Sequence, residues 1–138
     1  MKKNESFYII GVDGGASKTR GVLFSNSGET LAIIIEKGSN LSLNGELASD
    51  RLENIIYNLC KKSKIPTDHV GAVGLGLSGS SNQNGRDMVF GKLDRMQLSK
   101  RTLIMNDAEA AYEVNCPGDF GILVTVGTGI ICISRSAG

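Results

Sequence analysis

Apolar residues fall in short runs along the chain, and polar or glycine-rich turns separate them. The first three runs follow one another closely, at residues 7–13, 20–25 and 30–36. Short apolar runs joined by tight turns are typical of consecutive strands. We therefore expect the chain to begin with a three-stranded antiparallel meander.

The pattern then changes to helical spacing over residues 46–63, where one face collects the apolar side chains Ala48, Leu52, Ile55, Ile56, Leu59 and Cys60. A strand is expected at 70–77, a helix at 85–98, a strand at 102–105 and a short helix at 107–115. Two more strands are expected at 120–126 and 130–134. A meander followed by β–α units predicts an α/β fold, with a mixed sheet and helices on its faces.

Composition narrows the class of protein. The 138 residues carry 15 basic and 14 acidic side chains, a formal net charge of +1, so neither nucleic acid nor a membrane surface is an expected partner. The three cysteines are odd in number and form no C-x-x-C, which argues against disulfides and zinc. Cys60 and Cys132 fit the core. Without a signal-peptide pattern or a spanning apolar run, the cytoplasm is the expected compartment.

The candidate chemistry begins in the turn after the first strand. Asp13 ends an apolar run, and the next residues are Gly14, Gly15, Ala16, Ser17, Lys18 and Thr19. The two glycines would allow positive φ and a close approach of backbone N–H groups to an anion. The lysine and threonine add a cation and a hydroxyl, and Asp13 is an oxygen ligand suited to Mg²⁺. The alternative is an ordinary hairpin turn.

A second strand–turn–strand near the end of the chain repeats this pattern, with Gly127, Thr128 and Gly129 in the turn. Two such loops facing each other would hold the phosphates of one nucleotide. Between them, Asp107 follows a short strand, at the position where ligands collect in open α/β sheets. It would accept a proton from a hydroxyl. Alternatively, Asn106 and Glu109 form a capping box, and Asp107 only favours the helix N-terminus.

Three further polar residues are weighed as site residues. Asn40 and Ser78 each follow an apolar strand and lie in loops at the expected cleft edge. Both also suit a turn, and Ser78 suits a cap. His69, the single histidine, precedes a strand, and a surface loop position is expected for it.

Four motifs in order resemble the BadF/BadG/BcrA/BcrD-type ATPase family, and within it the N-acetylglucosamine kinases. They read GVDGGASKTRGVL, GLGLSG, NDAEAA and TVGTGI. The resemblance covers nearly the whole chain. It implies a ribonuclease-H-like fold of the sugar kinase, Hsp70 and actin superfamily, with ATP, Mg²⁺ and an amino sugar or related molecule as ligands.

The resemblance also implies roles for single residues. Asp13 would position Mg²⁺ through water, and residues 14–19 and 127–129 would form two phosphate loops. Asp107 would deprotonate the acceptor hydroxyl, and Asn40 and Ser78 would lie at the sugar. The reaction would be in-line transfer of the γ-phosphoryl group of ATP to that hydroxyl.

Members of the family have two lobes and roughly twice this length, so residues 1–138 are expected to be an N-terminal lobe without its C-terminal partner. Kinase activity is then expected of a full-length protein, and little of these residues by themselves. An exposed apolar face where the C-terminal lobe would pack would favour a homodimer.

Two alternatives remain. An ATPase activator of 2-hydroxyacyl-CoA dehydratases would show an iron–sulfur chromophore under anaerobic preparation, although Cys116 and Cys132 do not match the placement expected of its ligands. A regulatory lobe that binds nucleotide or sugar would show no catalytic defect when Asp107 is changed to Asn.

Overall fold

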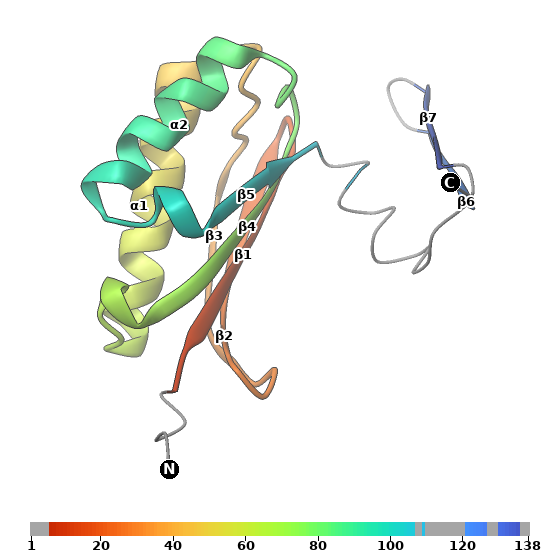
Figure 1. Cartoon of the computed structure of the whole chain (residues 1–138). Helices are drawn as coiled ribbons and strands as arrows, with labels where there is room; N and C mark the ends of the chain where they lie inside the picture. Colours follow the sequence, from red (N-terminus) through yellow and green to blue (C-terminus); the bar gives the residue numbers. More distant parts are fainter. Residues whose placement is uncertain (1–5, 107–108, 110–120, 127–129, 136–138) are drawn as a thin grey trace.

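A computed structural model of the chain describes residues 6–106, 109, 121–126 and 130–135, the last two ranges as backbone. The elements run in an order that alternates sheet and helix after an initial meander (Figure 1). They are β1 (Tyr8–Gly14), β2 (Lys18–Ser25), β3 (Thr30–Lys37), α1 (Gly45–Ser63), β4 (Val70–Leu77), α2 (Gln83–Arg95), β5 (Thr102–Met105), β6 (Gly121–Val126) and β7 (Ile130–Arg135), with 3₁₀ turns at Thr67–His69 and Ser99–Arg101.

The first five strands form one mixed sheet in the order β3-β2-β1-β4-β5. The pairs β1–β2 and β2–β3 are antiparallel, which confirms the predicted meander. The pairs β1–β4 and β4–β5 are parallel, so β4 is an interior strand. As a result β1, β3, β4 and β5 all end at the same edge of the sheet. The strands β6 and β7 pair with each other in a separate antiparallel hairpin.

Helix α1 forms where the helical spacing predicted it, one residue earlier at its start. Asn44 is the N-cap: its side-chain oxygen accepts a hydrogen bond from the N–H of Leu47 at 3.0 Å. Lys64 ends the helix in the left-handed conformation, with φ of 58°. Lys61 and Lys62 in the last turn favour the negative end of the helix dipole.

Helix α2 is displaced from its predicted range of 85–98. It begins at Gln83, because Asn82 caps it by accepting from the N–H of Gly85 at 2.9 Å. It ends at Arg95, because Gln97 adopts a φ of 60° and turns the chain out of the helix. Apolar periodicity continued past this break through Leu98, so the pattern alone overextended the helix.

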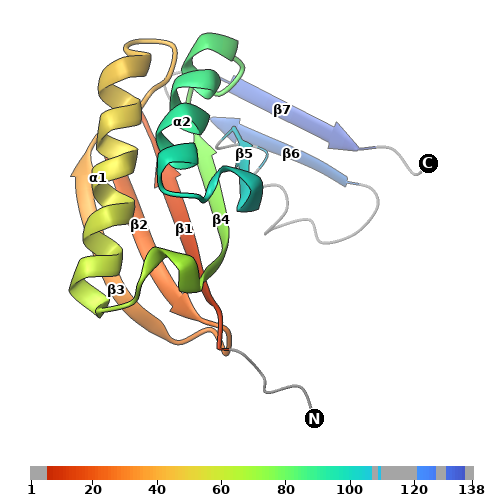
Figure 2. The same ribbon diagram turned by 60° about the vertical axis from the view of Figure 1, so that its left-hand side comes forward.

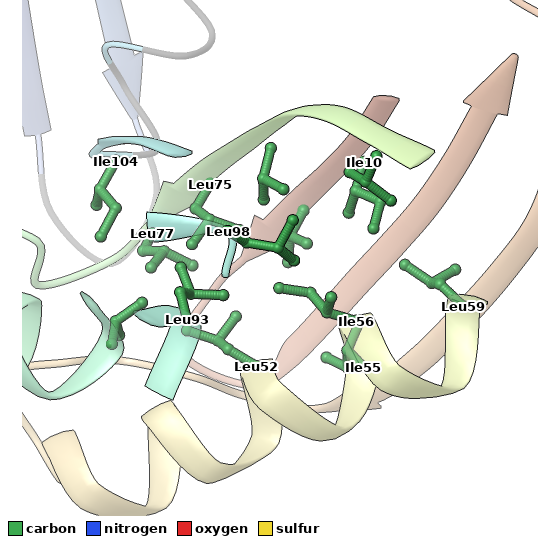
Figure 3. Close-up of a cluster of buried hydrophobic side chains, with 14 of the residues drawn as sticks. Ile10, Leu52, Ile55, Ile56, Leu59, Leu75, Leu77, Leu93, Leu98 and Ile104 are labelled. Atoms are coloured by element: carbon green, nitrogen blue, oxygen red, sulfur yellow. The ribbon is translucent and has the colours of Figure 1, made fainter. Parts of the chain in front are cut away.

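Both helices cover the same face of the five-stranded sheet (Figures 1 and 2). Their apolar sides interleave with the strands in one buried cluster, whose labelled members are Ile10, Leu52, Ile55, Ile56, Leu59, Leu75, Leu77, Leu93, Leu98 and Ile104 (Figure 3). Cys60 belongs to this core, as expected, and burial raises the pKa of its thiol. Its thiol therefore stays protonated and packs as a small apolar group.

The opposite face of the sheet carries no helix among the described residues. Its strand positions include Val22, Phe24 and Ile33, which line an apolar groove of about 600 Å³. Ile35 and Leu103 on this face are each 59% exposed. No helix in the described ranges is long and apolar enough to cross a membrane.

Candidate phosphate-binding site

Three loops meet at the edge where β1, β3 and β4 end. They are the β1–β2 turn at residues 14–17, the β3–α1 loop at 38–44 and the β4–α2 loop at 78–82. Ser78 joins them through its backbone: its N–H donates to the Gly14 carbonyl at 2.8 Å, and its carbonyl accepts from the N–H of Leu41 at 3.0 Å. The loops predicted to carry chemistry are therefore neighbours.

The β1–β2 turn is tight. The N–H of Gly15 donates to the Lys18 carbonyl at 2.9 Å, which leaves Ala16 and Ser17 at the tip. Both residues are exposed, and within the described part of the chain the N–H groups of Ala16 and Ser17 make no hydrogen bond. The described structure thus places two unpaired backbone donors on exposed residues beside Lys18, an arrangement that suits an anion such as phosphate.

The glycines of this turn serve a different purpose from the one the sequence suggested. Neither Gly14 nor Gly15 adopts positive φ; among the described glycines, Gly28 and Gly79 do. Gly14 is instead required for space, because a Cβ there would meet the Ser39 hydroxyl and lie 2.6 Å from Leu77. Close packing, and not left-handed backbone, therefore explains this glycine.

Asp13 lies at the carboxyl end of β1 on the open face of the sheet, exposed and directly opposite Arg20 in the β1–β2 ladder. Both line the 600 Å³ groove, where Gly76 is the neighbour of Asp13 on β4. The described residues contain no group of three or more His, Cys, Asp or Glu that would enclose a metal ion. A single exposed carboxylate beside a phosphate loop still fits Mg²⁺, which is commonly held by one or two carboxylates, phosphates and water.

Asn40 and Ser78 lie in neighbouring loops, which the hydrogen bond from the Leu41 N–H to the Ser78 carbonyl joins. Gly79, with φ of 73°, packs so closely on the Asn40 turn that a Cβ there would lie 2.5 Å from Asn40 Oδ1. That oxygen accepts from the N–H groups of Ser42 at 2.9 Å and Leu43 at 3.3 Å. Asn40 is thus a turn residue, the alternative considered from the sequence. Its part in sugar binding stays a prediction.

Thr19 is completely buried, unlike its exposed neighbours Lys18 and Arg20. Strand alternation turns it toward the helix-covered side of the sheet. Its hydroxyl donates to the Lys37 carbonyl at 2.9 Å. The predicted phosphate loop therefore has exposed side chains at Ser17 and Lys18 and a buried one at Thr19.

The capping box is confirmed. The N–H of Asn106 donates to the Glu109 carboxylate at 2.9 Å, and the N–H of Glu109 donates to Asn106 Oδ1 at 2.7 Å. Asp107 and the second turn, Gly127, Thr128 and Gly129, lie outside the described residues. The flanking β6 and β7 confirm the predicted strand pairing around that turn. His69 is exposed in a 3₁₀ turn, as expected for a surface residue.

Sequence reasoning missed the residues that support the first turn from behind. Ser39 is 1% exposed, and its N–H donates to the Gly15 carbonyl at 3.0 Å. Arg51 of α1 donates from Nη1 to the Gly38 carbonyl. These contacts join residues far apart in the chain, so no local pattern signals them.

The solved structures that share this arrangement include sugar kinases. A candidate N-acetylglucosamine kinase from Chromobacterium violaceum superposes with a TM-score of 0.71 at 26% identity, covering 93% of this chain and 45% of that one. A candidate sugar kinase from Cytophaga hutchinsonii, at 20% identity and a TM-score of 0.59, shares the fold over 95% of this chain and 48% of its own. The fold is therefore that of the actin-like ATPase class.

The chain belongs to the BadF/BadG/BcrA/BcrD ATPase family, which it matches over residues 10–138. It is 33% identical over 136 residues to the N-acetyl-D-glucosamine kinase of Dictyostelium discoideum, covering 91% of this chain. It is 25% identical over 130 residues to the N-acetylmuramic acid/N-acetylglucosamine kinase of Clostridium acetobutylicum, covering 94% of this chain. The chain spans only 42% of the length of each of these relatives.

Proposed function

We propose that this chain is the phosphate-binding N-terminal lobe of an ATP-dependent kinase that phosphorylates an amino sugar. The observation that carries the proposal is the β1–β2 turn at the edge where four strands end. There Ala16 and Ser17 are exposed residues beside Lys18, and their N–H groups make no hydrogen bond within the described part of the chain. Backbone donors and a cation together suit a polyphosphate, and ligands of open α/β sheets bind at this edge.

Each predicted residue except the buried Thr19 has a direct role in this proposal. Asp13 would hold Mg²⁺, which when bound neutralises phosphate charge. Residues 14–18 and 127–129 would position the phosphates, and Asp107 would take the proton of the acceptor hydroxyl. Asn40 and Ser78 would lie beside the sugar, and the contact between their two loops supports that role.

The acceptor class follows from the relatives. Both curated relatives are kinases of N-acetylglucosamine by name, and one also names N-acetylmuramic acid. We therefore propose an N-acetylated amino sugar as the acceptor. The sheet face that no described helix covers also supports a homodimer, which sedimentation equilibrium at increasing concentration would detect.

Isothermal titration calorimetry of this chain tests the proposal. Mg·tripolyphosphate and Mg·ATP should bind with similar, modest affinity, and adenosine should give no heat, because the features of this lobe recognise phosphate. Addition of N-acetylglucosamine should produce no sustained ADP formation. Failure of both triphosphates to bind at millimolar concentration, or equal binding of adenosine, would contradict the proposed function.

A further inference from the structure

Two buried hydroxyl groups lie directly beneath the β1–β2 turn. The Thr19 hydroxyl is 0% exposed and lies 2.7 Å from the Ser39 hydroxyl, which is itself almost completely buried. Thr19 also donates to the Lys37 carbonyl. The pair thus joins the start of β2 to the end of β3 and the loop that follows. Buried hydroxyl groups keep their positions where each finds a partner.

The same loop contacts the turn at two backbone positions. The N–H of Ser39 donates to the Gly15 carbonyl at 3.0 Å. Gly38 packs against Ala16 so closely that a Cβ on Gly38 would lie 2.9 Å from the N–H nitrogen of Ser17. The backbone that presents the two unpaired donors is therefore held against residues 38–39.

Arg51 supports this loop from the helix. Its guanidinium donates to the Gly38 carbonyl, which connects α1 to the segment packed on the turn. The contacts from residues 38–39 and from Arg51 thus fix the turn.

We propose that Thr19 and Ser39 are positioning residues, whose buried hydroxyl pair holds the turn at residues 14–17 in the shape that receives phosphate. This inference rests on the proposed function for its ligand. It assigns Thr19 to the support of the turn, where the sequence alone suggested a direct contact with phosphate. Removal of either hydroxyl should loosen the turn and leave the rest of the sheet intact.

Amide hydrogen exchange measured by NMR tests the inference without any ligand. The probes are the N–H groups of Gly15, Ser39 and Ser78, whose hydrogen bonds hold the turn. In Thr19→Val their exchange should accelerate by roughly tenfold or more, because one hydrogen bond of the supporting network is lost. Ser39→Ala is the second variant and should act in the same direction.

Two controls separate positioning from general destabilisation. Thr102→Val removes a similar threonine bond, from Oγ1 to the Leu98 carbonyl at 2.8 Å, on a distant strand, and should leave these three amides unchanged. Thr19→Ser restores the hydroxyl and should restore protection. Unchanged exchange in both Thr19→Val and Ser39→Ala would overturn the inference.

Ligand binding then decides between the two proposals. Accelerated exchange together with weaker Mg·tripolyphosphate binding in Thr19→Val, reversed in Thr19→Ser, supports the positioning role for phosphate. A wild-type chain that never binds triphosphate would contradict the proposed function. In that case the hydroxyl pair would still hold the turn, but the proposal that the turn binds phosphate would be refuted.

Discussion

Asp13 and Arg20 form an exposed pair of opposite charges across the β1–β2 ladder, at one end of the open groove. The sequence predicted the acid as a magnesium residue but did not single out the arginine. A partner seven residues away becomes visible only when the hairpin register is known. The carboxylate that would attract Mg²⁺ therefore has a cation as its neighbour.

The variant Asp13→Asn should distinguish the contribution of Mg²⁺ to binding from the contribution of the phosphates. Mg·ATP should bind roughly tenfold more weakly, because a charged oxygen partner of the hydrated cation is lost. Metal-free tripolyphosphate should bind as well as before or better, because a negative charge near a polyanion is removed. Calorimetry with and without Mg²⁺ measures both. Asp50→Asn, which alters an ion pair with Lys92 on the helix side, is the matched control and should change neither affinity.

Single residues also show where sequence reasoning succeeds and fails. Thr19 was predicted to lie in the turn, whereas β2 begins at Lys18, so that strand alternation buries Thr19 on the side opposite Lys18 and Arg20. Its partner Ser39 was not predicted, because the contact spans 20 residues of chain. Gly14 was recognised as special for its φ, whereas its actual constraint is the packing of Ser39 and Leu77.

At the scale of elements, the ends of helix α1 were predicted to within one residue, because its capping residues lie directly beside the segment with apolar periodicity. Asn44 caps its start and Lys64 turns the chain at its end. Helix α2 was predicted less well, since an apolar pattern continues past Gln97, where the backbone leaves the helix. Periodicity identifies a helix, and caps and backbone turns set its ends.

The N-cap of α1 gives a prediction about stability. Asn44→Ala should lower the free energy of unfolding by about 1 kcal/mol, because the N–H of Leu47 loses its acceptor. The control is Asn54→Ala on the exposed side of the same helix, where alanine is the better helix former and stability should stay level or rise slightly. Urea unfolding followed by circular dichroism measures both. A loss in Asn54→Ala as large as that in Asn44→Ala would contradict the capping role.

At the scale of the whole molecule, one core lies between the helices and a single face of the sheet, and the other face is bare in the described residues (Figures 2 and 3). The class of fold followed from the order of elements, and the meander was confirmed. The sequence could not show that both described helices share one face, because periodicity does not say which side of a sheet a helix covers.

Because the core lies on one side of the sheet, the side chains packed between the helices and that side should contribute most of the free energy of unfolding. Leu52→Ala, at 1% exposure, should cost about 2–5 kcal/mol of unfolding free energy, because the lost contacts leave a cavity. Leu47→Ala, at 44% exposure on the same helix, should cost less than about 1 kcal/mol. Thermal or urea unfolding distinguishes them. Equal losses in the two variants would show that α1 does not pack against the sheet as described.

A residue-resolved NMR titration with Mg·tripolyphosphate tests the central claim most directly, because it asks whether the β1–β2 turn receives phosphate. The amide signals of Ala16, Ser17 and Lys18 should shift and saturate together. Lys18→Gln should weaken this binding, while Lys100→Gln, an exposed lysine outside the site, should not. Saturable binding that leaves these three amides unmoved would contradict the account.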